Sequence, residues 1–132
     1  MKEESTQKQI FKQEFKKRCF RFSLSILKLT DVLPKNQINR SLIDQLIRSA
    51  TSIGANVVEG GNSSSKKEFI NYFLISLKST SETLYWLALV REVNPGYKMK
   101  VDDLISEATQ IKKMLSTIIL NTRNNSKLYI NS

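Results

Sequence analysis

Apolar residues recur along the chain at steps of three and four, the spacing that places side chains on one face of an α-helix. The first such segment runs from about Gln7 to Leu33 and stops before Pro34, which cannot continue a helix. Extra apolar residues widen its stripe, as a helix buried on two sides requires. The positions are Phe11, Phe15, Cys19, Phe22, Ile26, Leu29 and Leu33, widened by Phe20, Leu24 and Leu27.

A second periodic segment runs from about Ile38 to Glu59. Asn36 or Asn39 can cap its start, because a short polar side chain there accepts a hydrogen bond from a free backbone N–H. Gly60-Gly61 follows its last turn, where a residue in the left-handed conformation commonly ends a helix. The stripe of this helix consists of Ile43, Leu46, Ala50, Ile53 and Val57.

The third segment opens with Ser65 and Glu68, three residues apart, which is the spacing of a capping box. In this motif the serine hydroxyl accepts a hydrogen bond from the backbone N–H of the acidic residue, and the carboxylate accepts one from the backbone N–H of the serine. The segment ends at Asn94-Pro95-Gly96, a strong stop signal. Its stripe is expected at Ile70, Phe73, Leu77, Thr80, Leu84 and Leu87.

The fourth segment runs from about Val101 to Thr122, with Asp102 and Asp103 in its first turn, where negative charge suits the helix dipole. Its stripe is Leu104, Ala108, Ile111, Leu115 and Ile118. Short links force neighbouring helices to run antiparallel, so the pattern predicts an all-α, up-down four-helix bundle. We expect one domain over residues 1–132, with polar, frayed ends at 1–6 and 124–132. The predicted core includes Phe22, Ile26, Ile53, Phe73, Leu77, Leu84, Ile111 and Leu115.

Composition agrees with this architecture. The chain has 132 residues, four of them Gly and two Pro, too few for a fold rich in turns. The longest apolar run, Leu84–Val90, is too short to cross a bilayer, and the N-terminus lacks the apolar stretch of a signal peptide. We therefore expect a cytoplasmic protein with no membrane partner.

The formal net charge of +9 attracts polyanions such as RNA, DNA or an acidic protein. Lys8, Lys12 and Lys16 fall at steps of four and form one ridge on the first helix. We hypothesise that this ridge and its basic neighbours bind phosphates, against the alternative that they form a solvated outer face. The neighbours are Lys17, Arg18, Arg21 and Lys28.

Catalytic chemistry has little support. The chain contains no histidine, which removes the usual general base and the commonest metal ligand. Cys19 lies on the apolar stripe and is interpreted as a buried core thiol. Asn56 and Glu59 stand among apolar neighbours, and a structural role is favoured over a ligand site. We expect no enzyme, no cofactor and no metal.

Three motifs together resemble one known family. They are a Ser-Ile-x-x-Asn-x-x-Glu helix end, a Ser-x-x-Glu-Phe helix start and a Glu-Thr-x-Tyr-Trp-Leu segment. The chain is similar in these motifs, and in its Leu33-Pro34-Lys35 break, to bacterial four-helix-bundle proteins of the 23S ribosomal RNA intervening-sequence family. It departs at Ser79, where related members often carry an acidic residue. The motif residues, for which structural or interface roles are expected, are Asn56, Glu59, Ser65, Glu68, Phe69, Glu82, Tyr85 and Trp86.

The resemblance implies a bundle that assembles as a pentameric ring. It also implies relatedness to accessory proteins of diversity-generating retroelements, which associate with a reverse transcriptase and nucleic acid. Tyr85 and Trp86 add apolar area beside a complete stripe, which is typical of an interface, against the alternative that both only complete the core. The leading hypothesis is a ring-forming bundle that binds RNA or DNA, and the alternative is a protein scaffold for an acidic partner.

Overall fold

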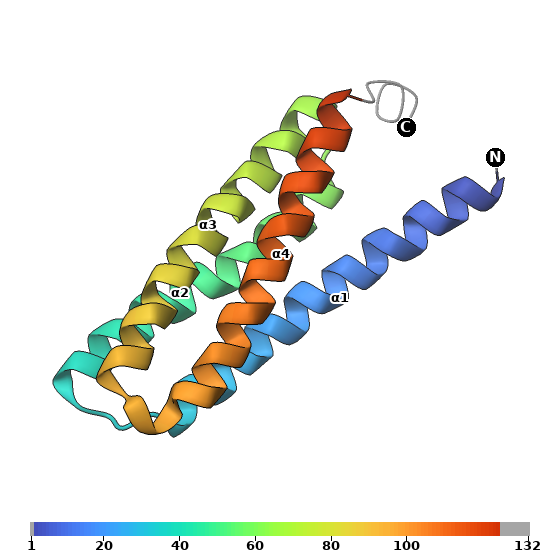
Figure 1. Cartoon of the computed structure of the whole chain (residues 1–132). Coiled ribbons are helices and arrows are strands. Elements are labelled where there is room, and N and C mark those ends of the chain that lie inside the picture. The colour runs from blue at the N-terminus through green and yellow to red at the C-terminus, as the bar shows by residue number, and fades with distance from the viewer. Residues whose placement is uncertain (1, 125–132) are drawn as a thin grey trace.

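The computed structural model describes residues 2–124, with side chains from Thr6 onward, as four long helices (Figure 1). They are α1 (Lys2–Val32), α2 (Gln37–Gly61), α3 (Lys66–Val93) and α4 (Lys98–Asn124), with a single 3-10 turn, η1 (Pro95–Tyr97), before α4. This range contains no strand, and the predicted all-α, up-down four-helix bundle is confirmed. The expected polar end at 125–132 lies outside the described residues.

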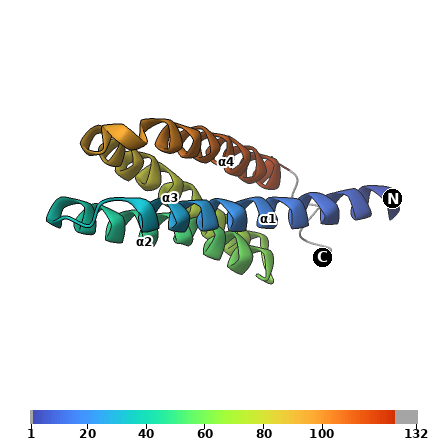
Figure 2. The same ribbon diagram turned by 90° about the horizontal axis from the view of Figure 1, so that it is seen from below.

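Helix α1 leaves the bundle toward its N-terminus. It begins at Lys2, within the segment that the sequence pattern leaves outside the first helix. Both views show its N-terminal half diverging from the other three helices (Figures 1 and 2). Its C-terminal half packs into the bundle and ends before Pro34, as predicted.

Two of the predicted helix starts are confirmed by their caps. The Asn36 side chain accepts from the Asn39 backbone N–H at 2.8 Å, so Asn36 is the cap of α2. The Ser65 hydroxyl accepts from the Glu68 backbone N–H at 3.1 Å, which is the first bond of the predicted capping box. Each bond satisfies one of the donors that a helix start leaves without an intrahelical partner.

Asn39 does not cap a helix but joins two turns. Its side chain and that of Asn94 exchange reciprocal hydrogen bonds of 2.8 and 2.9 Å inside the protein. Asn39 also donates to the Pro34 carbonyl and Asn94 to the Val90 carbonyl. Because buried amides are costly without partners, this pair fixes the turn after α1 against the turn after α3.

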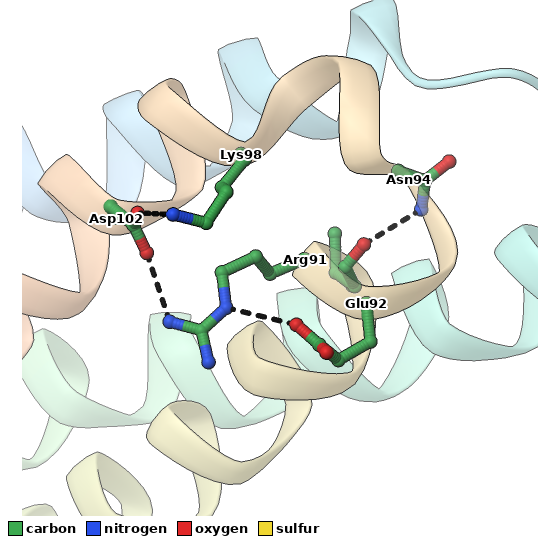
Figure 3. Close-up of polar contacts among 6 residues, drawn as sticks. Arg91, Glu92, Asn94, Lys98 and Asp102 are labelled. Atoms are coloured by element: carbon green, nitrogen blue, oxygen red, sulfur yellow. Dashed lines mark hydrogen bonds and ion pairs between the residues drawn. The ribbon is translucent and has the colours of Figure 1, made fainter.

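The start of α4 differs from the prediction. The η1 turn runs directly into Lys98, so Asp102 and Asp103 lie in the second turn rather than the first. Asp102 accepts from Arg91 of α3 at 2.9 Å and lies 3.5 Å from the Lys98 ammonium (Figure 3). The hydrogen bond from Arg91 lowers the pKa of Asp102. The carboxylate thus serves the α3–α4 turn instead of the helix dipole.

The hydrophobic core follows the predicted stripes of α1 from Phe15 onward, of α2, and of α4 up to Leu115. The prediction that Phe20, Leu24 and Leu27 widen the buried face of α1 is wrong, because all three are exposed, and Phe11 is exposed as well. On α3 the buried stripe is shifted, although Phe73, Thr80 and Leu87 are buried as predicted. Leu77 and Leu84, predicted to be buried, are half-buried at its margin, while Ser76 and Thr83 are buried. Apolar periodicity could not reveal this, because the buried face of α3 is rich in hydroxyls. The predicted core residues that are buried are Phe22, Ile26, Ile53, Phe73, Ile111 and Leu115.

Hydroxyl groups form a seam between α2 and α3. Ser76 donates to the Ile53 carbonyl at 2.9 Å. Thr83 donates to Ser49 at 3.0 Å. Ser52 and Ser79 lie 2.9 Å apart, oxygen to oxygen. Small side chains let two helix backbones approach closely, and each hydroxyl here has a hydrogen-bond partner.

The glycines at the end of α2 extend this close approach. The prediction that Gly60-Gly61 ends the helix in a left-handed conformation is wrong, because both lie inside α2 and no described glycine has a positive φ. A Cβ atom on Gly60 would lie 2.8 Å from the Phe73 ring and 3.1 Å from the Tyr72 Cβ. Gly60 is therefore required for the packing of α2 against α3.

We expect Gly60→Ala to lower the free energy of unfolding by up to about 2 kcal/mol, measured by urea denaturation. Alanine in a helix interior normally gains about 1 kcal/mol over glycine, but overpacking a rigid site costs roughly 1–3 kcal/mol. The Phe73 ring cannot move away freely, since it stacks on Phe69 with ring centroids 4.1 Å apart.

Gly96→Ala is the matched control, because a Cβ there meets nothing within 4 Å. It should leave the stability unchanged or raise it by about 0.4–1 kcal/mol. A Gly60→Ala protein more stable than the parent would contradict the close-packing assignment.

Candidate nucleic-acid interface

The seven basic residues predicted to bind phosphates lie on different sides of α1. Lys8, Lys12 and Lys16 form one line. Steps of four and seven place Lys17, Arg21 and Lys28 on a second line, roughly 160° around the helix axis. Arg18 belongs to neither line. The structure therefore divides one predicted site into three parts.

Arg18 is held by α4. Its Nε and Nη2 atoms each donate to a Glu107 carboxylate oxygen at 2.8 Å, and Nη1 lies 3.4 Å from the Met114 sulfur. The hydrogen bond to Glu107 raises the pKa of Arg18. A bidentate pair of this geometry is specific, so Arg18 ties α1 to α4 rather than offering its charge to a ligand.

The second line faces solvent. Lys17, Arg21 and Lys28 are all exposed. Lys17 lies 3.6 Å from the Glu14 carboxylate one turn earlier, an exposed ion pair of small energetic value. Their surroundings match the alternative interpretation, in which the basic residues form a solvated outer face.

The first line borders a groove with a volume of about 450 Å³, which we call the lysine groove. It opens where α1 diverges from the bundle, between α1 and the ends of α2, α3 and α4 (Figure 1). A Cβ on Gly61 would lie 3.1 Å from the Lys16 Cε, so Lys16 crosses the end of α2. The groove is lined by Gln7, Lys8, Phe11, Lys12, Phe15, Lys16, Val57, Gly61, Phe69, Phe73, Ile118, Asn121 and Thr122.

The floor of the lysine groove is aromatic. Phe69 and Phe73 are buried and stack on each other, and Phe15 is buried beside them. Phe11 lies parallel to Phe15 but keeps 48% of its surface exposed. An apolar floor with half of one ring open to solvent is a surface for a flat or apolar ligand.

Among the residues that the structure describes, the charged side chains that line the lysine groove are all basic. None of the described residues that line it carries a carboxylate, whereas three are lysines. Amide and hydroxyl groups at Gln7, Asn121 and Thr122 complete its polar edge. The groove thus combines positive charge, hydrogen-bonding groups and exposed aromatic surface, which suits an anionic ligand with apolar parts.

The family-motif residues are spread over α2 and α3, and one of them, Asn56, lies at the seam. Asn56 donates to the Ser52 carbonyl at 2.8 Å and to the Ser52 hydroxyl at 3.0 Å. Ser79 meets the same Ser52 hydroxyl. The contacts of Asn56 are those of a structural residue, as the sequence favoured. The acidic members Glu59, Glu68 and Glu82 are exposed, and the structure does not bring them into the lysine groove.

Tyr85 and Trp86 leave apolar area at the outer edge of α3. Tyr85 is 60% exposed and contacts the Trp86 ring edge-on, at 5.2 Å between centroids. The Trp86 Nε1 atom is buried and has no hydrogen-bond partner. A buried donor without a partner is costly. Because this atom is shielded from solvent within the chain, the surface that the pair offers to another molecule is the exposed Tyr85 ring.

The described residues offer no second centre of chemistry. Between residues 2 and 124, no three potential metal ligands come together. No helix in that range combines the length and apolar character needed to span a bilayer. Cys19 is buried against Gly54, as predicted for a core thiol, and burial raises its pKa to about 12.

Sequence reasoning found the lysines but missed the groove beside them. It assigned Phe11, Phe69 and Phe73 to helix stripes or family motifs, where a core residue and a groove residue look alike. One signal was present: Phe11 and Phe15 alternate with the three lysines along α1. Interleaved aromatic and basic residues are typical of nucleic-acid-binding surfaces.

Two comparisons with known proteins agree. The family described as 23S rRNA-intervening sequence protein matches residues 12–117. A crystal structure of a protein of unknown function, from the S23 ribosomal protein family of Bacteroides thetaiotaomicron, has 32% sequence identity and a TM-score of 0.76. The similarity covers 82% of this chain and 96% of that one. No curated protein matches the chain in sequence.

We expect Cys19 to resist alkylation by iodoacetamide in the folded protein at pH 8 and to react fully in 6 M guanidinium, as read by mass spectrometry. The thiolate is the nucleophile, and a pKa of about 12 keeps the buried group protonated. Below pH 9.0, the ordinary pKa of the thiol, the folded and unfolded chains both keep the proton, and Cys19 does not change the free energy of unfolding. Between pH 9.0 and about 12 only the unfolded chain loses the proton, so the free energy of unfolding falls as pH rises. Rapid labelling of the folded protein would contradict the burial of this thiol.

Proposed function

This chain belongs to the 23S rRNA-intervening sequence protein family, and we propose that it is a non-enzymatic, ring-forming helical bundle that binds the phosphates of RNA or DNA. The observation that carries the proposal is the lysine groove, where Lys8 and Lys16 border one cavity whose described lining residues include no carboxylate, with Lys12 between them along the helix. The family description mentions ribosomal RNA, so RNA is the first polyanion to test.

The net charge of +9 favours the binding of polyanions, and the lysine groove is the surface where we expect them to bind. Lysines that neutralise phosphates release condensed counterions, so affinity falls steeply as salt rises. Successive lysines of the line are separated by about 6 Å along the helix axis, because each step of four residues rises by one turn. Contacts of this kind carry no base sequence, and binding is therefore sequence-tolerant.

A closed ring needs two different surfaces that fit each other, because each subunit contacts its neighbours head to tail. Two groups of apolar side chains among the described residues are candidates for these surfaces. The first patch is on α1, where Phe20, Leu24 and Leu27 are exposed. The second is on α3, where Tyr85 is exposed beside the half-buried Trp86. We propose that these patches meet in a homo-oligomer, a pentamer by family resemblance, which multiplies the weak contacts of each groove.

The alternative function is a protein scaffold that captures an acidic partner, such as a reverse transcriptase or another protein. The apolar floor of the groove and the exposed Tyr85 ring favour it. The two functions differ in their dependence on salt. Phosphate binding weakens steeply with salt, whereas capture of a protein through apolar area does not.

We expect a Lys8/Lys12/Lys16→Gln variant to bind RNA and DNA more weakly than the parent. Its slope of log affinity against log salt should fall by about one for each lost phosphate contact. Fluorescence anisotropy with labelled oligonucleotides between 50 and 300 mM salt measures both quantities.

The matched control is Lys17/Arg21/Lys28→Gln, which removes the same charge from the opposite side of the same helix. Its affinity and slope should stay close to those of the parent. Equal losses in both variants would show that net charge, and not the groove, drives binding. A parent protein that binds neither RNA nor DNA at low salt would leave the scaffold as the better proposal.

We expect the parent protein in light scattering to have a mass five times that of the 15.2 kDa chain. Phe20→Glu should dissociate this assembly, because a charge in an apolar contact costs desolvation energy. Phe20 is 66% exposed in the single chain, so its fold should survive the change. Met99→Glu is the control, since Met99 is 83% exposed at the start of α4, outside both patches. A parent protein of 15.2 kDa at micromolar concentration would contradict ring formation.

A further inference from the structure

The lysine groove carries more chemistry than phosphate binding requires. Phosphate binding alone needs only exposed cationic side chains and hydrogen-bond donors, and no aromatic surface. The groove instead sets its lysines around four phenylalanines, one of them half-exposed. The apolar floor calls for a ligand that has a flat, apolar part next to its negative charge.

We propose that the lysine groove binds unpaired nucleotides, with a base stacked on Phe11 and the flanking phosphates on Lys8, Lys12 and Lys16. This inference rests on the proposed function and specifies its ligand as single-stranded nucleic acid. Bases offer π-faces to aromatic rings whatever their sequence, and the backbone supplies the negative charge. In a duplex these faces are stacked on neighbouring pairs and cannot enter the groove.

The size of the groove fits this ligand. Its volume of about 450 Å³ lies within the range of roughly 300–1,000 Å³ typical of small-molecule sites. A nucleoside fills such a space, whereas a lone phosphate would leave the aromatic floor uncovered. The amides of Gln7 and Asn121 at the rim are able to hydrogen-bond the edges of the base.

The position of Phe11 makes it the residue on which a base would stack. Phe15, Phe69 and Phe73 are buried, so their rings serve the packing of the bundle. Phe11 lies on the half of α1 that diverges from the other helices, and its ring is parallel to that of Phe15 within 3°. Charge complementarity then selects the ligand, because Lys8 and Lys16 lie on either side of the Phe11 position along α1 and the described residues that line the groove include no carboxylate.

The test uses the full-length protein with fluorescein-labelled oligonucleotides of mixed sequence, as single-stranded RNA, single-stranded DNA and the matched duplex. The parent should bind both single strands more tightly than the duplex at the same salt. Phe11→Ala should weaken single-strand binding by about 5- to 150-fold, the worth of one stacked base. It should leave duplex binding and the salt slope unchanged, since it removes no charge.

Two further variants keep the test specific. Ile10→Ala trims an exposed apolar residue on the same helix, outside the groove, and should bind like the parent. Phe11→Trp keeps a stacking surface and should restore the single-strand affinity. Circular dichroism and the midpoint of thermal unfolding should show that all three variants fold.

The outcomes separate this inference from the proposed function. Equal binding of single strand and duplex, with no effect of Phe11→Ala, would overturn this inference. If the Lys8/Lys12/Lys16→Gln variant still lost affinity, the proposed phosphate binding would stand without it. Absence of nucleic-acid binding by the parent would remove both. A Phe11→Ala protein with a changed mass in light scattering and unchanged affinity would assign the groove to a second copy of the chain and overturn the inference.

Discussion

The close approach of α2 and α3 is the constraint on which the rest of the structure depends. Serine and threonine hydroxyls line the contact at Ser49, Ser52, Ser76, Ser79 and Thr83, where they bond to each other, to backbone carbonyls and, at Ser52, to the Asn56 amide. Such bonds contribute modestly when made, about 0.5–1.5 kcal/mol each, and cost more when broken. The seam therefore fixes one register of the two helices, where an apolar contact would tolerate several.

The seam also determines the floor of the lysine groove. It ends at Gly60, where the missing side chain admits the Phe73 ring. Phe73 in turn supports Phe69, and the pair closes the end of the bundle under the diverging part of α1. A larger residue at position 60 would push this aromatic pair outward into the groove. Stability and the shape of the candidate site are thus linked through one glycine.

The remaining contacts attach the C-terminal half of α1 to the bundle and leave its N-terminal half projecting. Arg18 is joined to Glu107 of α4, and Cys19 packs on Gly54 of α2. Beyond them, toward its N-terminus, α1 diverges from the bundle (Figures 1 and 2). The lysine line lies on the diverging part, so its charges face a cavity instead of a neighbouring helix. An anchored helix with one projecting half is a rigid way to present charge to a ligand.

The sequence by itself determined the number of helices, most of their boundaries and the antiparallel bundle. Helix periodicity, Pro34 and the Asn36 and Ser65 caps act locally, so each is readable from a few neighbouring residues. The family motifs were readable for the same reason. The net charge and the absence of histidine also required no structure.

Only the tertiary structure decided which face of α3 is buried and where the basic residues of α1 lie. Hydroxyls such as Ser76 and Thr83 become buried when a partner across the interface satisfies them, and that partner is distant in sequence. In the sequence Arg18 and Lys17 are adjacent basic residues with no feature that separates them. In the structure Arg18 pairs with Glu107, which is 89 residues away. The lysine groove likewise lies between several helices, so the pattern of one helix does not predict it.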